Sequence, residues 1–159
     1  MWTKLEEPPA TIETNIKMSV AALNYPFLWS IYGNSNIIGK VNLKKKIFDK
    51  IEASVKCNAS WRELRANADN RFLYFMEKSK LLCFDITNNS INTITEGIKC
   101  YDIGTKDEIA VGDYAGKIRM IFKESNNSAL SHWHSGNVNS VKFINGLNSL
   151  LSGGEEVCF

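Results

Sequence analysis

The chain has 159 residues, of which 44% are hydrophobic and 23% charged, and its formal net charge is +2. This composition excludes a disordered chain, and the near balance of charges gives no reason to expect a strongly basic nucleic-acid binder. The first residues are polar and acidic, and the longest apolar stretch, at residues 20–32, is too short and interrupted to span a bilayer. We therefore expect neither a secretory signal nor a membrane partner.

Short apolar or alternating runs recur along the chain, separated by clusters of Gly, Asn and Ser. Most are rich in β-branched or aromatic residues, which is typical of β-strands. In chain order these predicted strands lie at residues 27–32, 36–43, 71–77, 80–86, 90–95, 108–113, 117–122, 138–144 and 149–153. Turn-forming residues lie between them at 33–35, 87–89 and 114–116. One segment, residues 51–70, is ambiguous between a short helix and a strand followed by a polar loop, and we favour the strand and loop.

The runs repeat along the chain at a regular interval. When residues 71–86 are placed over residues 108–123, Leu81 falls on Ile118, and a later match places Gly112 on Gly153. A repeat of about 40 residues with four short strands is the period of a β-propeller blade, whereas a sandwich has no reason to repeat at this interval. We therefore predict an all-β propeller. The approximate repeats are residues 11–46, 47–89, 90–127 and an incomplete 128–159.

The length does not fit a closed ring. At about 40 residues per blade the chain holds about three to four blades, whereas closed propellers of this kind commonly need about six to eight. Residues 11–17 read as an outer strand without its inner partners. We expect an open ring from a chain that is incomplete at both ends, with unpaired strand edges exposed at its terminal blades.

Both histidines lie in the tripeptide His132-Trp133-His134, which is followed by Val138 and then by a Leu-Leu-Ser-Gly-Gly strand that contains Ser152. This arrangement resembles the WD-repeat pattern, although the usual Trp-Asp ending is degraded to Phe-Asp at 84–85 and to Ile-Phe at 121–122. The resemblance implies a structural hydrogen bond between His134 and Ser152. A buried imidazole needs partners for both nitrogens, and a serine hydroxyl can be one of them.

The amino-acid sequence of residues 110–120, 132–138 and 150–156 is more specific than a generic WD repeat. It resembles the WD repeat-containing protein 75 family of small-subunit processome subunits. The close match covers residues 108–159, about a third of the chain. This resemblance implies a non-catalytic scaffold in pre-rRNA transcription and processing, located in the nucleolus of the nucleus. Its partners would be other processome subunits, with contact to U3 small nucleolar RNA or pre-rRNA. The alternative is a generic WD-repeat adaptor for protein–protein interaction outside the nucleolus.

Two groups of residues are candidates for contact with RNA or a partner. Lys44, Lys45 and Lys46 form the dense basic cluster of the chain, although a charge run on a turn is more often simply solvated. Trp61, with Arg62 and Arg65, could stack on a base or a peptide, although a tryptophan in such a place more often packs in the core.

We expect no catalysis, no cofactor, no small-molecule substrate and no metal. His132 and His134 would point the same way on a strand, but no third ligand stands at a matching spacing. Ser152 beside His134 lacks the flanking residues of a nucleophile elbow. The cysteines at 57, 83, 100 and 158 form no Cys-x-x-Cys motif, so we expect ordinary buried or half-buried thiols.

Overall fold

The computed structural model describes residues 18–54, 56–58, 60–122, 128–132, 134–144 and 149–156. Within these ranges the regular structure consists of fourteen strands in four antiparallel sheets. None of the described residues belongs to a helix that is long and apolar enough to cross a bilayer.

Each sheet is a simple meander in which every strand pairs with the next one along the chain. The first sheet contains β1 (Met18–Asn24), β2 (Phe27–Tyr32), β3 (Ile37–Asn42) and β4 (Ile47–Glu52). The second contains β5 (Arg62–Ala66), β6 (Phe72–Glu77), β7 (Lys80–Asp85) and β8 (Ser90–Glu96). The third contains β9 (Ile98–Ile103), β10 (Ile109–Asp113), β11 (Lys117–Ile121) and β12 (Ser128–His132), and the fourth contains β13 (Val138–Ile144) and β14 (Ser149–Gly154).

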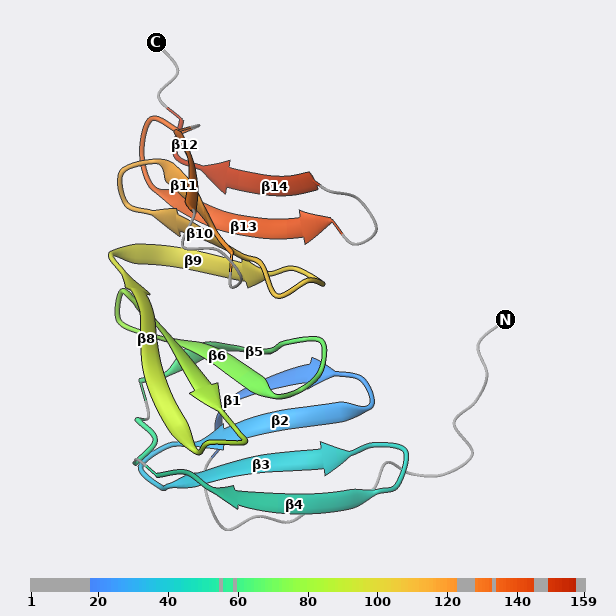
Figure 1. Ribbon diagram of the computed structural model, residues 1–159. Helices are drawn as coiled ribbons and strands as arrows, with labels where there is room; N and C mark the ends of the chain where they lie inside the picture. The colour runs from blue at the N-terminus through green and yellow to red at the C-terminus, as the bar shows by residue number, and fades with distance from the viewer. Residues whose placement is uncertain are drawn as a thin grey trace.

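The four sheets follow one another in an open arc (Figure 1). The first strand of each sheet faces the inside of the arc, since β1, β5, β9 and β13 together line one groove. This is the arrangement of propeller blades around a channel. The prediction of an all-β propeller whose ring is not closed is confirmed.

The expected repeats and the observed sheets differ in phase by one strand. The repeat expected at 47–89 begins with β4 of the first sheet and continues with β5 to β7 of the second. The favoured interpretation of residues 51–70 is confirmed, because β5 is a strand and a polar turn follows it. The outer strand expected at 11–17 lies outside the described residues.

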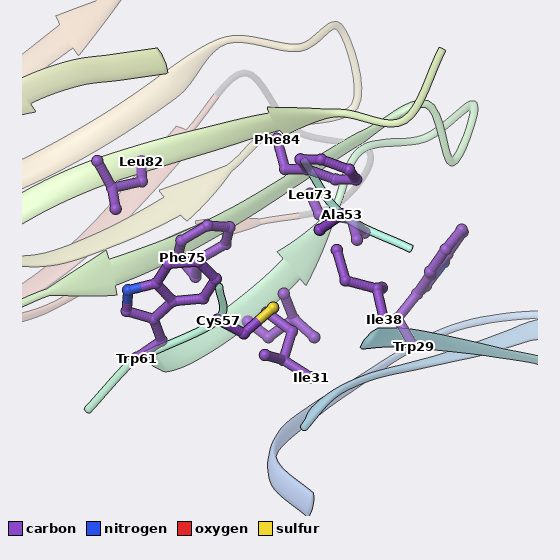
Figure 2. Close-up of a cluster of buried hydrophobic side chains, with 11 residues drawn as sticks. Trp29, Ile31, Ile38, Ala53, Cys57, Trp61, Leu73, Phe75, Leu82 and Phe84 are labelled. Atoms are coloured by element: carbon purple, nitrogen blue, oxygen red, sulfur yellow. The ribbon is translucent and has the colours of Figure 1, made fainter. Parts of the chain in front are cut away.

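The core is divided among the interfaces between neighbouring sheets. The interface of the first and second sheets buries large aromatic and aliphatic side chains (Figure 2). Its buried members are Trp29, Ile31, Ile38, Ala53, Cys57, Trp61, Leu64, Leu73, Phe75, Leu82 and Phe84.

The next two interfaces use different residues. Between the second and third sheets the buried residues are Tyr74, Met76, Leu81, Cys83, Ile98, Tyr101, Ile109 and Val111. Between the third and fourth they are Cys100, Ala110, Ile118, Val138 and Val141. Alternate residues of one strand therefore serve different interfaces, as the two faces of a strand require: Tyr101 faces the second sheet and Cys100 the fourth.

The turn between β10 and β11 requires a glycine. Gly116 has a φ of 79°, in the left-handed region that glycine adopts without steric cost. A Cβ atom at this position would collide with the backbone carbonyl of His134. Gly116, in the turn expected at 114–116, therefore allows the backbone of His134 to pass close to this turn in the connection from β12 to β13.

Candidate functional site

His134 lies in the connection between the third and fourth sheets. Its ring contacts two residues that come 18 and 22 positions later, on β14 and just after it. Its Nε2 is 3.0 Å from Ser152 Oγ, and its Nδ1 pairs with the Glu156 carboxylate. Because a carboxylate only accepts hydrogen bonds, Nδ1 donates to Glu156, and the Ser152 hydroxyl, which can donate or accept, is the partner of Nε2. Both nitrogens of the imidazole are satisfied, which is a structural arrangement.

The residues that hold His134 alternate along one strand and its extension. Ser152 and Gly154 lie two positions apart on β14, and Glu156 follows two positions later. Side chains two apart on a strand share a face, so all three meet the same imidazole. A Cβ atom at Gly154 would lie 2.5 Å from the His134 ring. The sequence expectation included Ser152 but missed Gly154 and Glu156, although the Ser-x-Gly-x-Glu alternation could have revealed them.

The three lysines of the basic cluster lie on the tight turn between β3 and β4. All three are exposed, and the backbone N–H groups of Lys44 and Lys45 donate to Asn42 Oδ1 at 3.1 and 3.0 Å. Lys46 has a φ of 55°, and the Lys44 ammonium lies 5.4 Å from the centre of the Tyr25 ring. The turn therefore holds this charge at the outer end of the first sheet.

Trp61 is a core residue, which contradicts its expected contact with RNA or a partner. Only 6% of its surface is exposed, and its ring stacks on Phe75 with 4.2 Å between ring centres (Figure 2). Its indole N–H donates to Glu77 Oε1 at 3.1 Å, so its polar group is also occupied. A base or a peptide would have no ring face on which to stack. The other interpretation, in which the tryptophan packs in the core, is the correct one.

Arg62 and Arg65 stand in the same strand as each other but make separate contacts. Arg62 is exposed and donates to the carbonyl of Lys78, in the turn between β6 and β7, at 3.1 Å. Arg65 faces the inside of the arc, where its Nε lies 3.1 Å from Asp102 Oδ1. The structure thus places Arg65 on the inner groove, whereas the lysine turn belongs to the outer strands β3 and β4.

The inner groove has a volume of about 570 Å³ and contains a buried carboxylate. Asp102 of β9 is 3% exposed, and Lys142 Nζ of β13 lies 2.9 Å from its Oδ1. The backbone N–H of Phe143 donates to its other oxygen at 2.9 Å. Together with Arg65, these contacts connect the inner strands of the second, third and fourth sheets.

Asp102 is the principal site residue that the sequence analysis missed. Arg65, Asp102 and Lys142 are separated by 37 and 40 positions, which is close to the blade period. Residues one period apart occupy equivalent places in neighbouring blades. Opposite charges at that spacing on expected inner strands were therefore a usable signal.

A second carboxylate fixes the turn after β7. Asp85, in the Phe-Asp pair that stands in place of Trp-Asp, forms an ion pair with Arg71 at 3.0 Å and accepts the Thr87 N–H at 2.9 Å. The hydrogen bond from Arg71 lowers the pKa of Asp85 below its ordinary value. Asp85 thus fixes the backbone of the turn that follows β7 by accepting its N–H.

The cysteines of the described residues are reduced and buried, at positions 57, 83 and 100. Burial raises the pKa of the Cys57 thiol, and it raises that of Cys100 to about 11. Within the described part of the chain, no three His, Cys, Asp or Glu side chains converge as they would around a metal ion. The side chain of His132 and the position of Cys158 lie outside what is described.

No protein-family model matches the sequence, and no curated protein matches it. Solved structures do share its fold. The computationally designed Ika4 protein aligns over 95% of this chain and 94% of its own, with a TM-score of 0.61 and 11% identity. U3-55K aligns over 82% of this chain and 43% of its own, with a TM-score of 0.56 and 8% identity.

The tricorn protease also aligns, over 89% of this chain and 15% of its own, with a TM-score of 0.63 and 12% identity. At such identities the likeness shows the fold alone. A designed protein and a protease share this architecture, and function therefore has to be argued from this chain's own residues. This chain spans less than half the length of U3-55K.

Proposed function

We propose that the chain is a non-catalytic WD-repeat scaffold of the small-subunit processome, acting in pre-rRNA transcription and processing in the nucleolus. The observation that carries the proposal is the sequence of residues 108–159, which resembles that processome family. Among its described residues, one set of contacts joins the turns of the third and fourth sheets. In it Gly116 adjoins the His134 carbonyl, and Ser152 and Glu156 hold the His134 ring.

The rigid construction of the chain supports a scaffolding role. The inter-sheet cores and the ion pairs of Asp102 fix each blade to its neighbours, and the turns then present exposed groups on a stiff framework. The lysine turn at 44–46 is the candidate for RNA or partner contact. Trp61 is not, since it is buried.

The experiment is affinity purification of the tagged full-length parent protein, followed by mass spectrometry and RNA analysis. The proposal expects processome subunits and U3 small nucleolar RNA to co-purify, and expects the protein to localise to the nucleolus. The triple variant Lys44→Ser, Lys45→Ser, Lys46→Ser should reduce the recovered RNA if the turn contacts it. Recovery of other partners from outside the nucleolus would instead favour a generic WD-repeat adaptor and overturn the processome role.

A further inference from the structure

The inner groove carries more than structural ion pairs, because its two cations are accessible whereas the carboxylate between them is buried. Arg65 Nε and Lys142 Nζ both lie on the same oxygen, Asp102 Oδ1, at 3.1 and 2.9 Å. The Asp102 side chain is 4% exposed, whereas those of Arg65 and Lys142 are 43% and 54% exposed. A ligand in the groove therefore meets two cations brought together by one carboxylate that it cannot reach.

One wall of the groove is a strand edge. β1 is the first strand of its sheet and pairs only with β2 among the described strands, and its residues 20–24 line the groove. The backbone N–H and C=O groups on the outer side of an edge strand can pair with an additional strand. The side chains along this wall are small or aliphatic, from Val20 to Leu23. Such a wall suits an extended peptide.

The groove also contains one exposed carboxylate, that of Glu63. Glu63 has a φ of 56° at an irregularity in the pairing of β5 with β6, and such irregular positions are frequent at binding sites. A carboxylate at this place accepts a hydrogen bond from a peptide N–H, a donor that a phosphodiester group lacks. The mixture of two accessible cations and one accessible anion favours a peptide over RNA.

We infer that the inner groove binds an extended acidic peptide segment of a partner protein. The main chain of the segment runs along β1, and one Asp or Glu carboxylate bridges Arg65 and Lys142. The groove volume of about 570 Å³ lies within the usual range for ligand sites, about 300–1,000 Å³. This inference does not depend on the processome role, since any partner with such a segment satisfies it.

The test uses the full chain and a fluorescein-labelled peptide of alternating valine and glutamate, titrated by fluorescence anisotropy. The same peptide with glutamine in place of glutamate is the neutral control, and a labelled decauridylate is the RNA probe. We expect the acidic peptide to bind more tightly than either. Lys142→Met and Arg65→Met keep much of the apolar stem and should each weaken binding about tenfold or more, as expected for loss of a hydrogen bond to a charged group.

The matched control is Lys117→Met, the same change at an exposed lysine outside the groove, which should leave affinity unchanged. Circular dichroism melts establish that each variant is folded. Asp102→Asn provides an independent arm that keeps both cations, and it should bind the acidic peptide more tightly, because the competing carboxylate charge is gone. A purely structural network predicts no such gain.

Three results would overturn the inference. These are equal affinity for the acidic and neutral peptides, no loss of affinity in the folded Lys142→Met and Arg65→Met variants, and tighter binding of decauridylate with the same residue dependence. None of them bears on nucleolar location or on processome co-purification. The two proposals can therefore fail separately.

Discussion

The interface between the first and second sheets and the interface between the third and fourth are built differently. The first buries large rings, among them Trp29, Phe75 and Phe84, each fully excluded from solvent. The fully described side chains buried in the second include no aromatic ring, and Ala110 and Val138 lie at its centre. Here the backbone itself comes close, because Gly112 leaves room for the Val138 side chain.

The difference predicts which of the two interfaces opens at the lower free energy. Hydrophobic stabilisation grows with the apolar area removed from water, at about 25 cal/mol per Å². The aromatic interface removes more of this area, whereas the small-residue interface adds the contacts of Asp102 with Lys142 and Phe143. We therefore expect the third–fourth interface to open at a lower free energy than the first–second interface, as unequal units of one fold do.

The largest effect is expected at the aromatic interface. Phe75→Ala should lower the free energy of unfolding by about 3–5 kcal/mol, because it leaves a cavity and removes the ring on which Trp61 stacks. Urea unfolding followed by tryptophan fluorescence measures this loss. The matched control is Phe122→Ala, at a side chain that is 40% exposed, and it should change stability little. Equal losses in the two variants would contradict the importance assigned to this interface.

A smaller effect is expected where the backbones approach. A Cβ atom at Gly112 would lie 2.5 Å from Val138 Cγ1 and 2.8 Å from Cys100 Sγ. Gly112→Ala should therefore cost about 1–3 kcal/mol through overpacking. Because the shortest of these contacts are with the Val138 side chain, Val138→Ala in the same molecule should restore part of the loss. Strictly additive losses in the double variant would show that the close approach is not the cause.

The histidine turn should contribute less than either core. Ser152→Ala removes the hydroxyl bonded to His134 Nε2 and should cost about 0.5–1.5 kcal/mol. Ser149→Ala, at an exposed position of the same strand, controls for the change in strand propensity. If both variants lose the same stability, the His134–Ser152 bond adds nothing of its own.

The strand predictions were most successful where a single strand carries a continuous apolar run. The continuous apolar run of β6 was recognised, whereas β9 was not, because Asp102 interrupts its apolar pattern. That aspartate is acceptable in a buried strand because Arg65, Lys142 and the Phe143 N–H, all from other sheets, compensate its charge. β5 was ambiguous for a related reason, since Arg-Glu-Leu-Arg-Ala consists of good helix formers, and tertiary pairing with β6 makes it a strand.

The candidate site shows the same division. The contact of His134 with Ser152 was expected from a family resemblance, since the two residues share a recognisable motif. The partners of Asp102 lie about one repeat period away in each direction. Their contact can therefore be predicted only once the inner strands are placed side by side. For Trp61 the sequence left both contact and core packing open, because a tryptophan beside two arginines gives no indication of which face is buried, and the structure shows the core.

The last prediction compares the two interfaces through cysteines that each contains. Cys57 belongs to the first–second interface and Cys100 to the third–fourth. Burial raises the pKa of both thiols, that of Cys100 to about 11, so at pH 8 both are protonated in the closed state and do not react. Labelling by a thiol reagent must then proceed through local opening, and Cys100 should be modified faster than Cys57 under native conditions.

Mass spectrometry of peptides after timed alkylation measures the two rates separately. A tenfold ratio corresponds to about 1.4 kcal/mol between the two opening free energies. Both rates should rise with pH up to the pKa of an ordinary thiol, because the opened cysteine reacts as its thiolate. Phe75→Ala should accelerate Cys57, which shares its interface, more than Cys100, and Gly112→Ala should do the reverse. If either substitution accelerates both cysteines equally, the arc opens as one unit and the two interfaces are not independent.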